Sequence, residues 1–477
     1  MTSQIVSESR NQGAEMLVDP SAREVLLDSP RTETNMGRTL ALADLHSSVS
    51  DPLLDTMNFL NEITARYPAA VSFAPGRPYD GLFDPACIGE YLNVYTSYLR
   101  DAGHTDDQIR AALFQYGRTK GQIHGLIAQV VANDEDIRVS PEAVVVTVGA
   151  QEGMFILLLA LFAEPRDVLL VSSPCYIGIT GAARLLGITV VPVPEGAEGL
   201  SPDAVRRAAR RVIAAGQRPR ALYVVPDFAN PSGASMTVPA RKRLLKAAAA
   251  ERILVIEDNP YGFFTREAKP RPTLKSLDED GTVIYLGSFA KTCFPGARLG
   301  YVLADQRVVA DDGRHSLLAD ELAKIKSMIT VNTPSLSQAV IGGMLVQSGC
   351  RLREANTAAI SFYRKNLLIV LAELERHFPA GRRSELGVSW NCPDGGFFTV
   401  VTVPFAADER ALERSACEYV VLWTPMDAFY VGGGGWYQLR ISSSYLPPEQ
   451  VKEGIARLAA FIAAEADSAC AGGPGRT

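Results

Sequence analysis

Short apolar strands alternate with helices through the middle of the chain, and this alternation limits the possible folds most strongly. Runs rich in β-branched residues occur at 144–148, 168–171, 190–193, 221–225, 253–256 and 283–286. Helical patterns separate several of them, at 151–162, 202–215 and 239–251. Strands that are apolar on both faces are typical of parallel sheets covered by helices on both sides. The sequence therefore predicts an α/β fold with a mostly parallel sheet.

The pattern changes after about residue 335. A long helical stretch at 335–377 precedes antiparallel-looking strands at 388–390, 397–403, 419–423 and 437–441, and an amphipathic helix at 448–465 follows. We expect residues 41–75 and 335–465 to form a small α+β domain, and residues 76–334 to form a large domain. Residues 1–40 are predicted to be a flexible arm, and residues 466–477 a disordered tail.

Composition excludes several classes of protein. The formal net charge of the 477 residues is −6, which argues against a nucleic-acid-binding protein, because such a protein needs clustered Lys and Arg. The longest apolar run, 154–163, is too short to cross a membrane. Scattered cysteines without a C-x-x-C pair, and only five histidines, argue against a metal site or a disulfide framework. Residues 1–40 carry no targeting pattern, so we expect a cytoplasmic protein.

One lysine lies in a Gly- and Pro-rich turn that follows a predicted strand. Lys291 comes after the run 283–286, with Ser288 shortly before it and Arg298 shortly after it. Small and apolar surroundings disfavour the ammonium form, so the pKa of this lysine should be lowered and its amine should attack an aldehyde readily. Ser288 and Arg298 could hold a phosphate group with a hydroxyl and a guanidinium.

Two further turns after predicted strands carry polar side chains. Asp258 and Tyr261 follow the strand at 253–256, and Asn230 follows the strand at 221–225. Each could be only a helix N-cap or a plain turn. Ligands of open α/β sheets bind at the carboxyl ends of the strands, so the joint occurrence of these turns with Lys291 favours one ligand site.

The ordered set Asn230, Asp258, Tyr261, Lys291 and Arg298 resembles that of fold-type I pyridoxal-phosphate enzymes. The nearest match is with class I/II aminotransferases of the 2-aminoadipate and aromatic amino-acid group, over about residues 45–465. The resemblance implies an aspartate aminotransferase-like fold, with a seven-stranded-type sheet in the large domain. It also implies pyridoxal 5'-phosphate as cofactor, and a homodimer with active sites at the subunit interface.

The resemblance further implies roles for these residues. Lys291 would form a Schiff base with the cofactor aldehyde. Asp258 would keep the pyridine nitrogen protonated, so that the ring can withdraw electrons from the substrate Cα. Asn230 and Tyr261 would bind the phenolic oxygen of the ring.

Other positions match the phosphate and ring contacts of the family. Ser288 and Arg298 would hold the phosphate together with the backbone of Ala150 and Gln151, which lie at a predicted helix start. Tyr176 would stack on the pyridine ring, although it could be only a core aromatic residue.

Four positions match family contacts to the substrate and the neighbouring subunit. Arg440 would grip the substrate α-carboxylate, while Gly76, with Asn230, would line the substrate mouth. Tyr116 would reach the phosphate of the neighbouring subunit.

Three departures from the family pattern put the side-chain pocket in doubt. Ala290 stands where close relatives often have serine. The segment 424–429 replaces a usual Pro-Gly turn, and a run of glycines at 432–435 follows it.

Three functional hypotheses are compatible with these residues. The first is transfer of the α-amino group of an amino acid to a 2-oxo acid through a Lys291 Schiff base. The second keeps the cofactor but eliminates or replaces a β- or γ-substituent, cyclises or oxidises an amino acid, in specialised metabolism. The third, a transcriptional regulator with an aminotransferase-like sensor, is disfavoured because residues 1–70 contain no basic recognition-helix pattern.

Overall fold

The computed structural model describes residues 39–51, 53, 62–196, 198–267 and 269–471. The chain divides into two compact units, 1–50 and 51–477. Residues 1–38 of the predicted arm and 472–477 of the predicted tail lie outside the described residues.

The first unit contains two short 3-10 helices, η2 (Leu42–Asp44) and η3 (Ser47–Ser50). Residues 41–50 were expected in the small domain, but they belong to this separate unit. The physical reason is that their apolar side chains are exposed and join no core: Leu42, Leu45 and Val49.

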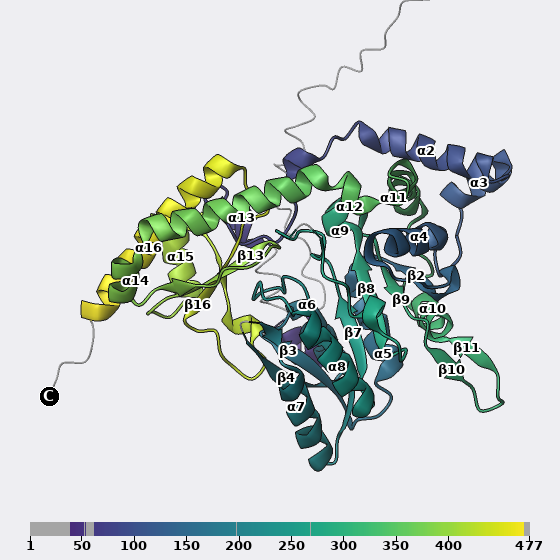
Figure 1. The fold of residues 1–477 in the computed structure, drawn as a ribbon, viewed down its shortest axis with the longest axis horizontal. Coiled ribbons are helices and arrows are strands. Elements are labelled where there is room, and N and C mark those ends of the chain that lie inside the picture. Colours follow the sequence, from purple (N-terminus) through teal and green to yellow (C-terminus); the bar gives the residue numbers. More distant parts are fainter. Residues whose placement is uncertain (1–38, 52, 54–61, 197, 268, 472–477) are drawn as a thin grey trace, which may run out of the picture. The chain divides into compact units, whose positions relative to one another are not determined.

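A sheet of eight strands lies at the centre of the second unit (Figure 1). Its order is β2 (Val144–Thr147), β9 (Gly300–Leu303), β8 (Val283–Ser288), β7 (Leu254–Asp258), β6 (Arg218–Val224), β3 (Asp167–Ser173), β4 (Thr189–Gly196) and β5 (Gly199–Leu200). Neighbouring strands are parallel from β8 to β4, whereas β9 and β5 are antiparallel to their neighbours. The predicted α/β fold with a mostly parallel sheet is confirmed. The sequence analysis missed β9, because it directly follows the Gly/Pro-rich turn.

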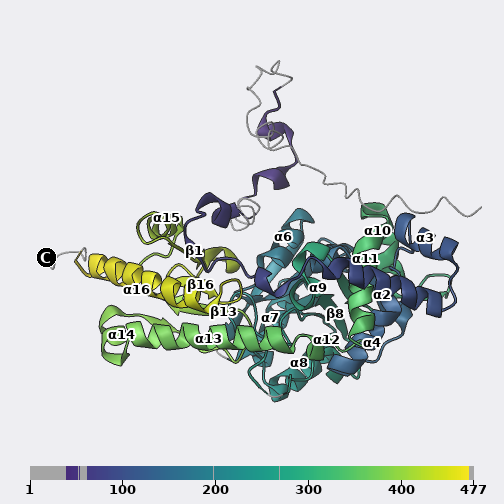
Figure 2. The same cartoon turned by 90° about the horizontal axis from the view of Figure 1, so that it is seen from above.

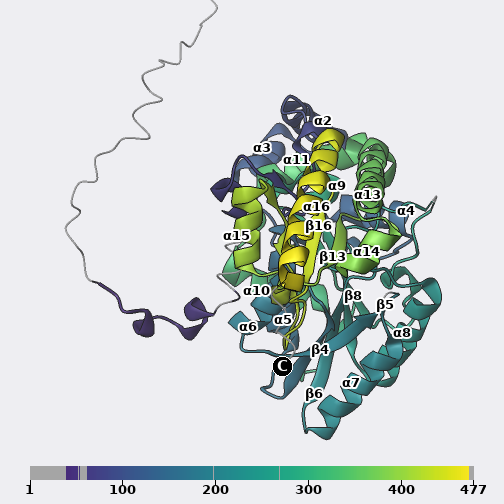
Figure 3. The same cartoon turned by 90° about the vertical axis from the view of Figure 1, so that its left-hand side faces the viewer.

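Helices cover both faces of this sheet, and the alternation of side chains along β3 shows why (Figure 3). Leu169 and Val171 pack with α5 (Gly149–Leu161) and α6 (Ile177–Leu185). Val168 and Leu170 point to the other face. That face is covered by α7 (Pro202–Ala214) and α8 (Val238–Ala250).

The β2 edge of the sheet packs against a further group of helices. Among the described residues, this group of helices includes α2 (Cys87–Asp101), α3 (Asp106–Phe114), α4 (His124–Glu135), α11 (Ser335–Gln347) and α12 (Leu352–Ala355). The hairpin β10 (Arg307–Val309) and β11 (His315–Leu317) leads into α10 (Leu318–Ile329).

A second sheet is antiparallel and forms the smaller α+β part. Its strand order is β12 (Ser389–Trp390), β13 (Phe398–Thr402), β16 (Gln438–Ser442) and β15 (Thr424–Pro425). The long helices α13 (Thr357–His377) and α16 (Pro448–Ala471) run side by side next to it, and α14 (Ala380–Leu386) and α15 (Glu409–Glu418) complete this part (Figure 2). No helix in the described part of the chain is long and apolar enough to span a bilayer.

Three predictions for the C-terminal half need correction. The helix predicted at 335–377 is interrupted between α11 and α12, because Gly349 and Cys350 both have positive φ, and again at Asn356 before α13. The strand predicted at 419–423 is β14 (Val421–Leu422), which pairs in parallel with β1 (Val71–Ser72) outside the antiparallel sheet. Residues 466–471, predicted to belong to a disordered tail, are the last turns of α16 instead, and Ala466 is buried on its apolar side.

Both sheets belong to the same compact unit. The division into domains at 75/76 and 334/335 therefore stays a proposal.

A buried ion pair fixes the loop that follows β6. Arg241 of α8 is fully buried and is paired with Asp227. Its guanidinium also donates to the carbonyl oxygens of Pro226, at 3.1 Å, and Met236, at 3.2 Å. Arg241 therefore ties both ends of the loop 226–236 to α8.

We expect Arg241→Met to lower the free energy of unfolding by about 3–5 kcal/mol, because the substitution leaves the buried Asp227 unpaired. The exposed pair Arg414–Glu465 is the matched control. Arg414→Met should cost only about 0–1 kcal/mol. Urea unfolding of the two variants measures both values, and equal losses would contradict the structural role assigned to Arg241.

Candidate active site

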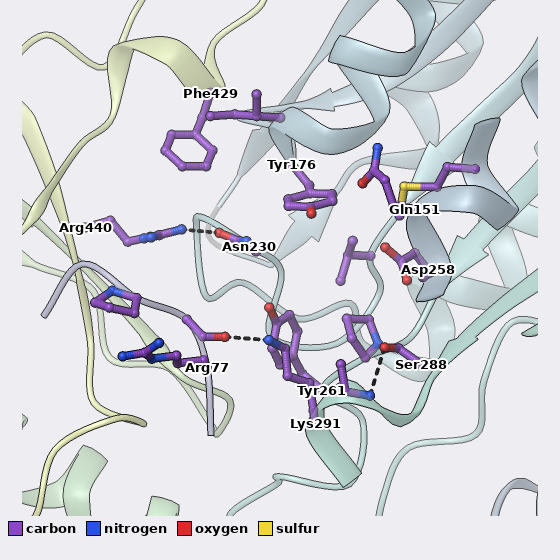
Figure 4. A pocket seen from close by; sticks show the side chains of 18 of the residues that line it. Arg77, Gln151, Tyr176, Asn230, Asp258, Tyr261, Ser288, Lys291, Phe429 and Arg440 are labelled. Carbon is purple, nitrogen blue, oxygen red and sulfur yellow. Dashed lines mark hydrogen bonds between the residues drawn. The ribbon is translucent and has the colours of Figure 1, made fainter. Parts of the chain in front are cut away.

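A cavity of about 370 Å³ lies at the carboxyl ends of the central strands (Figure 4). Turns after β2, β3, β6, β7 and β8 contribute to it, as do residues 74–77 and β16. The structure brings together all the predicted site residues except Tyr116. They are Gly76, Ala150, Gln151, Tyr176, Asn230, Asp258, Tyr261, Ser288, Lys291, Arg298 and Arg440.

Lys291 presents its amine to the cavity from α9 (Phe289–Thr292), the short helix that follows β8. Its Nζ donates to the Gly76 carbonyl oxygen at 2.6 Å. Burial, helped by the positive charges of Arg298 and Arg440, lowers the pKa of Lys291 to about 8, although the carboxylate of Asp258 acts in the opposite direction. A large fraction of this amine is therefore neutral and nucleophilic near pH 8.

Asp258 ends β7 and points one carboxylate oxygen into the cavity without a partner. Tyr223 donates to Oδ2 at 2.5 Å, whereas the buried Oδ1 has no hydrogen-bond partner among the described residues. Burial raises the pKa of Asp258 to about 6, and the bond from Tyr223 and the charge of Lys291 oppose this rise. A buried carboxylate oxygen without a donor is costly, so this position fits a ligand with an N–H group.

The start of α5 and Arg298 form an anion site at another part of the cavity. Ala150 and Gln151 line it from the first turn of α5, where backbone N–H groups have no helical acceptor. Gly149 has φ +71°, and a Cβ built on it would lie 2.7 Å from Nη2 of Arg298. Arg298 and Ser288 add a guanidinium and a hydroxyl, so a phosphate group fits this cradle.

An ion pair that the sequence analysis missed fixes the turn before α5. The Glu152 carboxylate accepts from the Val148 N–H at 2.7 Å, from Lys326 Nζ at 2.8 Å and from Thr330 Oγ1 at 2.6 Å. Lys326 is fully buried and neutralises Glu152 close to the anion site. No motif points to this pair, because its members are far apart in the sequence.

Arg440 enters the cavity from the second sheet. Its Nη1 donates to Asn230 Oδ1 at 2.6 Å, and its guanidinium carbon lies 4.5 Å from the ring centre of Phe398 and 5.2 Å from that of Phe429. Its buried Nε has no acceptor, and within the described ranges no carboxylate pairs with it. Burial lowers the pKa of Arg440 to about 10. Its Nη2 donates to the Ala74 carbonyl oxygen at 2.8 Å and to Thr424 Oγ1 at 3.1 Å, so the guanidinium has hydrogen-bond partners but no ion-pair partner among the described residues. A carboxylate ligand would supply the missing negative charge.

Two tyrosines bound the cavity between these charged groups (Figure 4). Tyr176 precedes α6, and its ring faces the interior. Tyr261 is buried, which raises the pKa of its phenol, and its ring packs edge-on against Phe397 and Phe398. A flat ring therefore fits beside these side chains.

The unusual segment 424–435 also reaches the site. Phe429 lines the cavity, and its carbonyl oxygen accepts from the Cys175 N–H at 2.8 Å. All the glycines of 432–435 have positive φ, and a Cβ built on Gly435 would lie 2.7 Å from the Tyr430 ring. The sequence did not predict that Phe429 lines the cavity. Its position depends on how the irregular segment 424–435 packs against the loop after β3.

Tyr116 lies outside the cavity and is 85% exposed. The backbone near it is joined to the start of α11, since Ser335 Oγ donates to the Gln115 carbonyl oxygen at 3.4 Å. Several other apolar side chains from α3, α10, α11 and the α10–α11 loop are exposed: Phe114, Met328, Ile329, Val331 and Leu336.

The lowered pKa of Lys291 predicts its reactivity. After dialysis to remove bound small molecules, we expect labelling of Lys291 by trinitrobenzenesulfonate to reach half its maximal rate near pH 8. An ordinary lysine reaches half its maximal labelling rate at about pH 10.4. Peptide mass spectrometry across pH 6–11 measures the rate, with exposed Lys452 as internal reference. A midpoint for Lys291 near 10 would contradict the electrostatics described above.

Comparisons with known proteins agree with this geometry. Residues 90–458 match the family model for aminotransferase class I and II. The chain is 50% identical to (S)-3,5-dihydroxyphenylglycine transaminase from Amycolatopsis orientalis, over 89% of this chain and 95% of that protein. It is 31% identical to 2-aminoadipate transaminase from Thermus thermophilus, over 84% and 92% of the two chains.

A solved structure is similar over nearly the same range. It is alpha-aminoadipate aminotransferase from Thermus thermophilus, complexed with N-(5'-phosphopyridoxyl)-L-leucine. The TM-score is 0.73 at 28% identity, over 91% of this chain and all of that one. The chain therefore belongs to the class I and II aminotransferase family.

Proposed function

We propose that the chain binds pyridoxal 5'-phosphate in this cavity and uses it to move the α-amino group of an aromatic amino acid or arylglycine to a 2-oxo acid. The chain is an amino acid aminotransferase by family, and its cofactor, residue roles and substrate class are our inferences. One observation carries them: the low-pKa amine of Lys291 and the unpartnered Oδ1 of Asp258 line the same cavity.

The donor groups fit this cofactor. The first turn of α5, with Ser288 and Arg298, would hold the phosphate, and Oδ1 of Asp258 would accept from the ring nitrogen. Asn230 and Tyr261 would bind the phenolic oxygen. When bound, the cofactor supplies an aldehyde for an amine and a cationic ring that withdraws electrons from Cα.

The protein's own groups then orient the substrate and move its proton. Arg440 would bind the α-carboxylate through its guanidinium, and this would fix the direction of the Cα–H bond. Lys291 Nζ, held by the Gly76 carbonyl oxygen and neutral above about pH 8, would accept the Cα proton and return it. The same groups are compatible with elimination or cyclisation, but the transaminase relatives favour amino transfer.

The side-chain pocket supports an aromatic substrate. Phe429 and Ile177 line the cavity beside Arg440. The relative that is 50% identical is named for an arylglycine, and aromatic rings pack favourably against such side chains.

Substitution of Arg440 tests the carboxylate role. We expect Arg440→Met to lower kcat/KM for phenylglycine by at least about 30-fold, because a buried charge pair contributes about 2 kcal/mol or more. Arg77→Met is the matched control, because Arg77 also lines the cavity but stacks on Tyr445, at 4.0 Å. The assay follows conversion of the bound cofactor to its amino form. An unchanged kcat/KM in Arg440→Met would refute the role of Arg440. Product formation from phenylglycine without the amino form of the cofactor would refute amino transfer.

Tyr116 and its exposed apolar neighbours support a homodimer, in which Tyr116 would complete the partner's phosphate site. We propose this state on the family resemblance and on the exposure of these side chains. A cytoplasmic location stays a prediction of the sequence.

Mixed dimers test whether the site is shared. Tyr116→Ala and Lys291→Ala proteins should each be nearly inactive. After mixing and subunit exchange, about a quarter of the unmodified activity should return, because half of the dimers are mixed and each has one intact site. A mixture of Lys291→Ala with Asp258→Ala is the control. Each of these changes damages the site of the subunit that carries it, so a mixed dimer has no intact site. Complementation in that control, or none with Tyr116→Ala, would exclude a shared site.

A further inference from the structure

Tyr223 is a buried side chain of β6 that lines the cavity next to Asp258. It pairs in the sheet with Ile256 of β7, so its long phenol reaches past that residue to the end of the strand. Its hydroxyl donates to Oδ2 of Asp258 at 2.5 Å. The other oxygen, Oδ1, is buried without a partner among the described residues.

We propose that Tyr223 is a positioning residue: it anchors Oδ2 of Asp258 so that the charged Oδ1 is presented to the cavity. This inference rests on the proposed function, because the expected ligand of Oδ1 is a protonated ring nitrogen. A carboxylate held by only one oxygen keeps a defined orientation and a free acceptor, which a cationic N–H donor requires.

The surroundings of Asp258 explain why a neutral donor is needed. The titratable groups that face it are Tyr223, Lys291, Cys175, Tyr176 and Tyr261. Lys291 is the cation among them, and its amine loses its charge as the pH rises through its pKa of about 8. Burial raises the pKa of the Tyr223 phenol well above its ordinary value, so its O–H remains a donor across the working pH range. Tyr223 therefore supports the carboxylate charge where Lys291 no longer does.

A second tyrosine–carboxylate pair in the same sheet provides a matched control. Tyr285 of β8 is buried and donates to Oε2 of the partly buried Glu135 at 2.6 Å, and Asn259 Nδ2 donates to the same oxygen at 3.2 Å. Neither residue lines the cavity. Removing either tyrosine hydroxyl therefore deletes the same kind of bond, but only Tyr223→Phe alters a carboxylate that faces the site.

The experiment compares Tyr223→Phe and Tyr285→Phe in the full chain. In the cofactor-free protein, ¹³C NMR of labelled aspartate, assigned with Asp258→Asn, gives the pKa of Asp258. We expect this pKa to rise in Tyr223→Phe and to stay unchanged in Tyr285→Phe. Pyridoxal phosphate should bind Tyr223→Phe about ten- to a hundredfold more weakly at pH 6.5. Affinity should recover towards pH 9, because Asp258 then loses its proton despite the raised pKa.

Recovery of cofactor affinity at higher pH separates a positioning role from a general loss of protein stability, because raising the pH would not restore a destabilised fold. Should Tyr223→Phe fail to fold, 3-fluorotyrosine at position 223 keeps the shape and makes the phenol a stronger donor, so it should lower the pKa of Asp258. An unchanged pKa in the phenylalanine or fluorotyrosine variant, or equal effects of the changes at 223 and 285, would overturn the inference. Failure of the unmodified chain to bind pyridoxal phosphate would instead refute the proposed function. The pKa of Asp258 in the cofactor-free protein would still test whether Tyr223 supports its charge.

Discussion

Charge buried without a protein partner is the constraint on which this site depends. Oδ1 of Asp258 and Nε of Arg440 are both enclosed, and neither has a hydrogen-bond partner in the described part of the chain. Elsewhere ion pairs neutralise buried charges such as Arg241–Asp227 and Lys326–Glu152. The buried Glu257 carboxylate instead accepts backbone N–H bonds, and Oε2 of Glu195 has no hydrogen-bond partner among the described residues. Asp258 and Arg440 differ from Glu195 in that both line the same cavity, where a ligand could supply the missing partners.

The fold and most of the cavity could be predicted from the sequence for one physical reason. Parallel strands are apolar on both faces, and their carboxyl ends meet at one edge of the sheet. Polar residues placed directly after such runs, such as Asn230, Asp258 and Lys291, are therefore brought together whatever the details of the helices. Arg440 lies on the other sheet, and its place in the site was predicted from family resemblance alone.

What could not be predicted depends on contacts between distant segments. Tyr223 lies inside an apolar run, and nothing in its neighbours reveals that its hydroxyl reaches the next strand. The Glu152–Lys326 pair joins two helices that are far apart in the chain. The break between α11 and α12 depends on two left-handed residues, Gly349 and Cys350, of which only the glycine is an expected signal. Periodicity alone extends a helix through such a break.

The glycine run at 432–435 has a consequence for the divergence of this enzyme. Each of its residues adopts a backbone conformation that costs a residue with a side chain about 1–3 kcal/mol. Replacing any of these glycines would consequently strain the backbone of the segment, whereas no residue of 424–429, which carries Phe429, has positive φ. The wall of the cavity at Phe429 can thus be altered with less backbone strain than the glycine run that follows it.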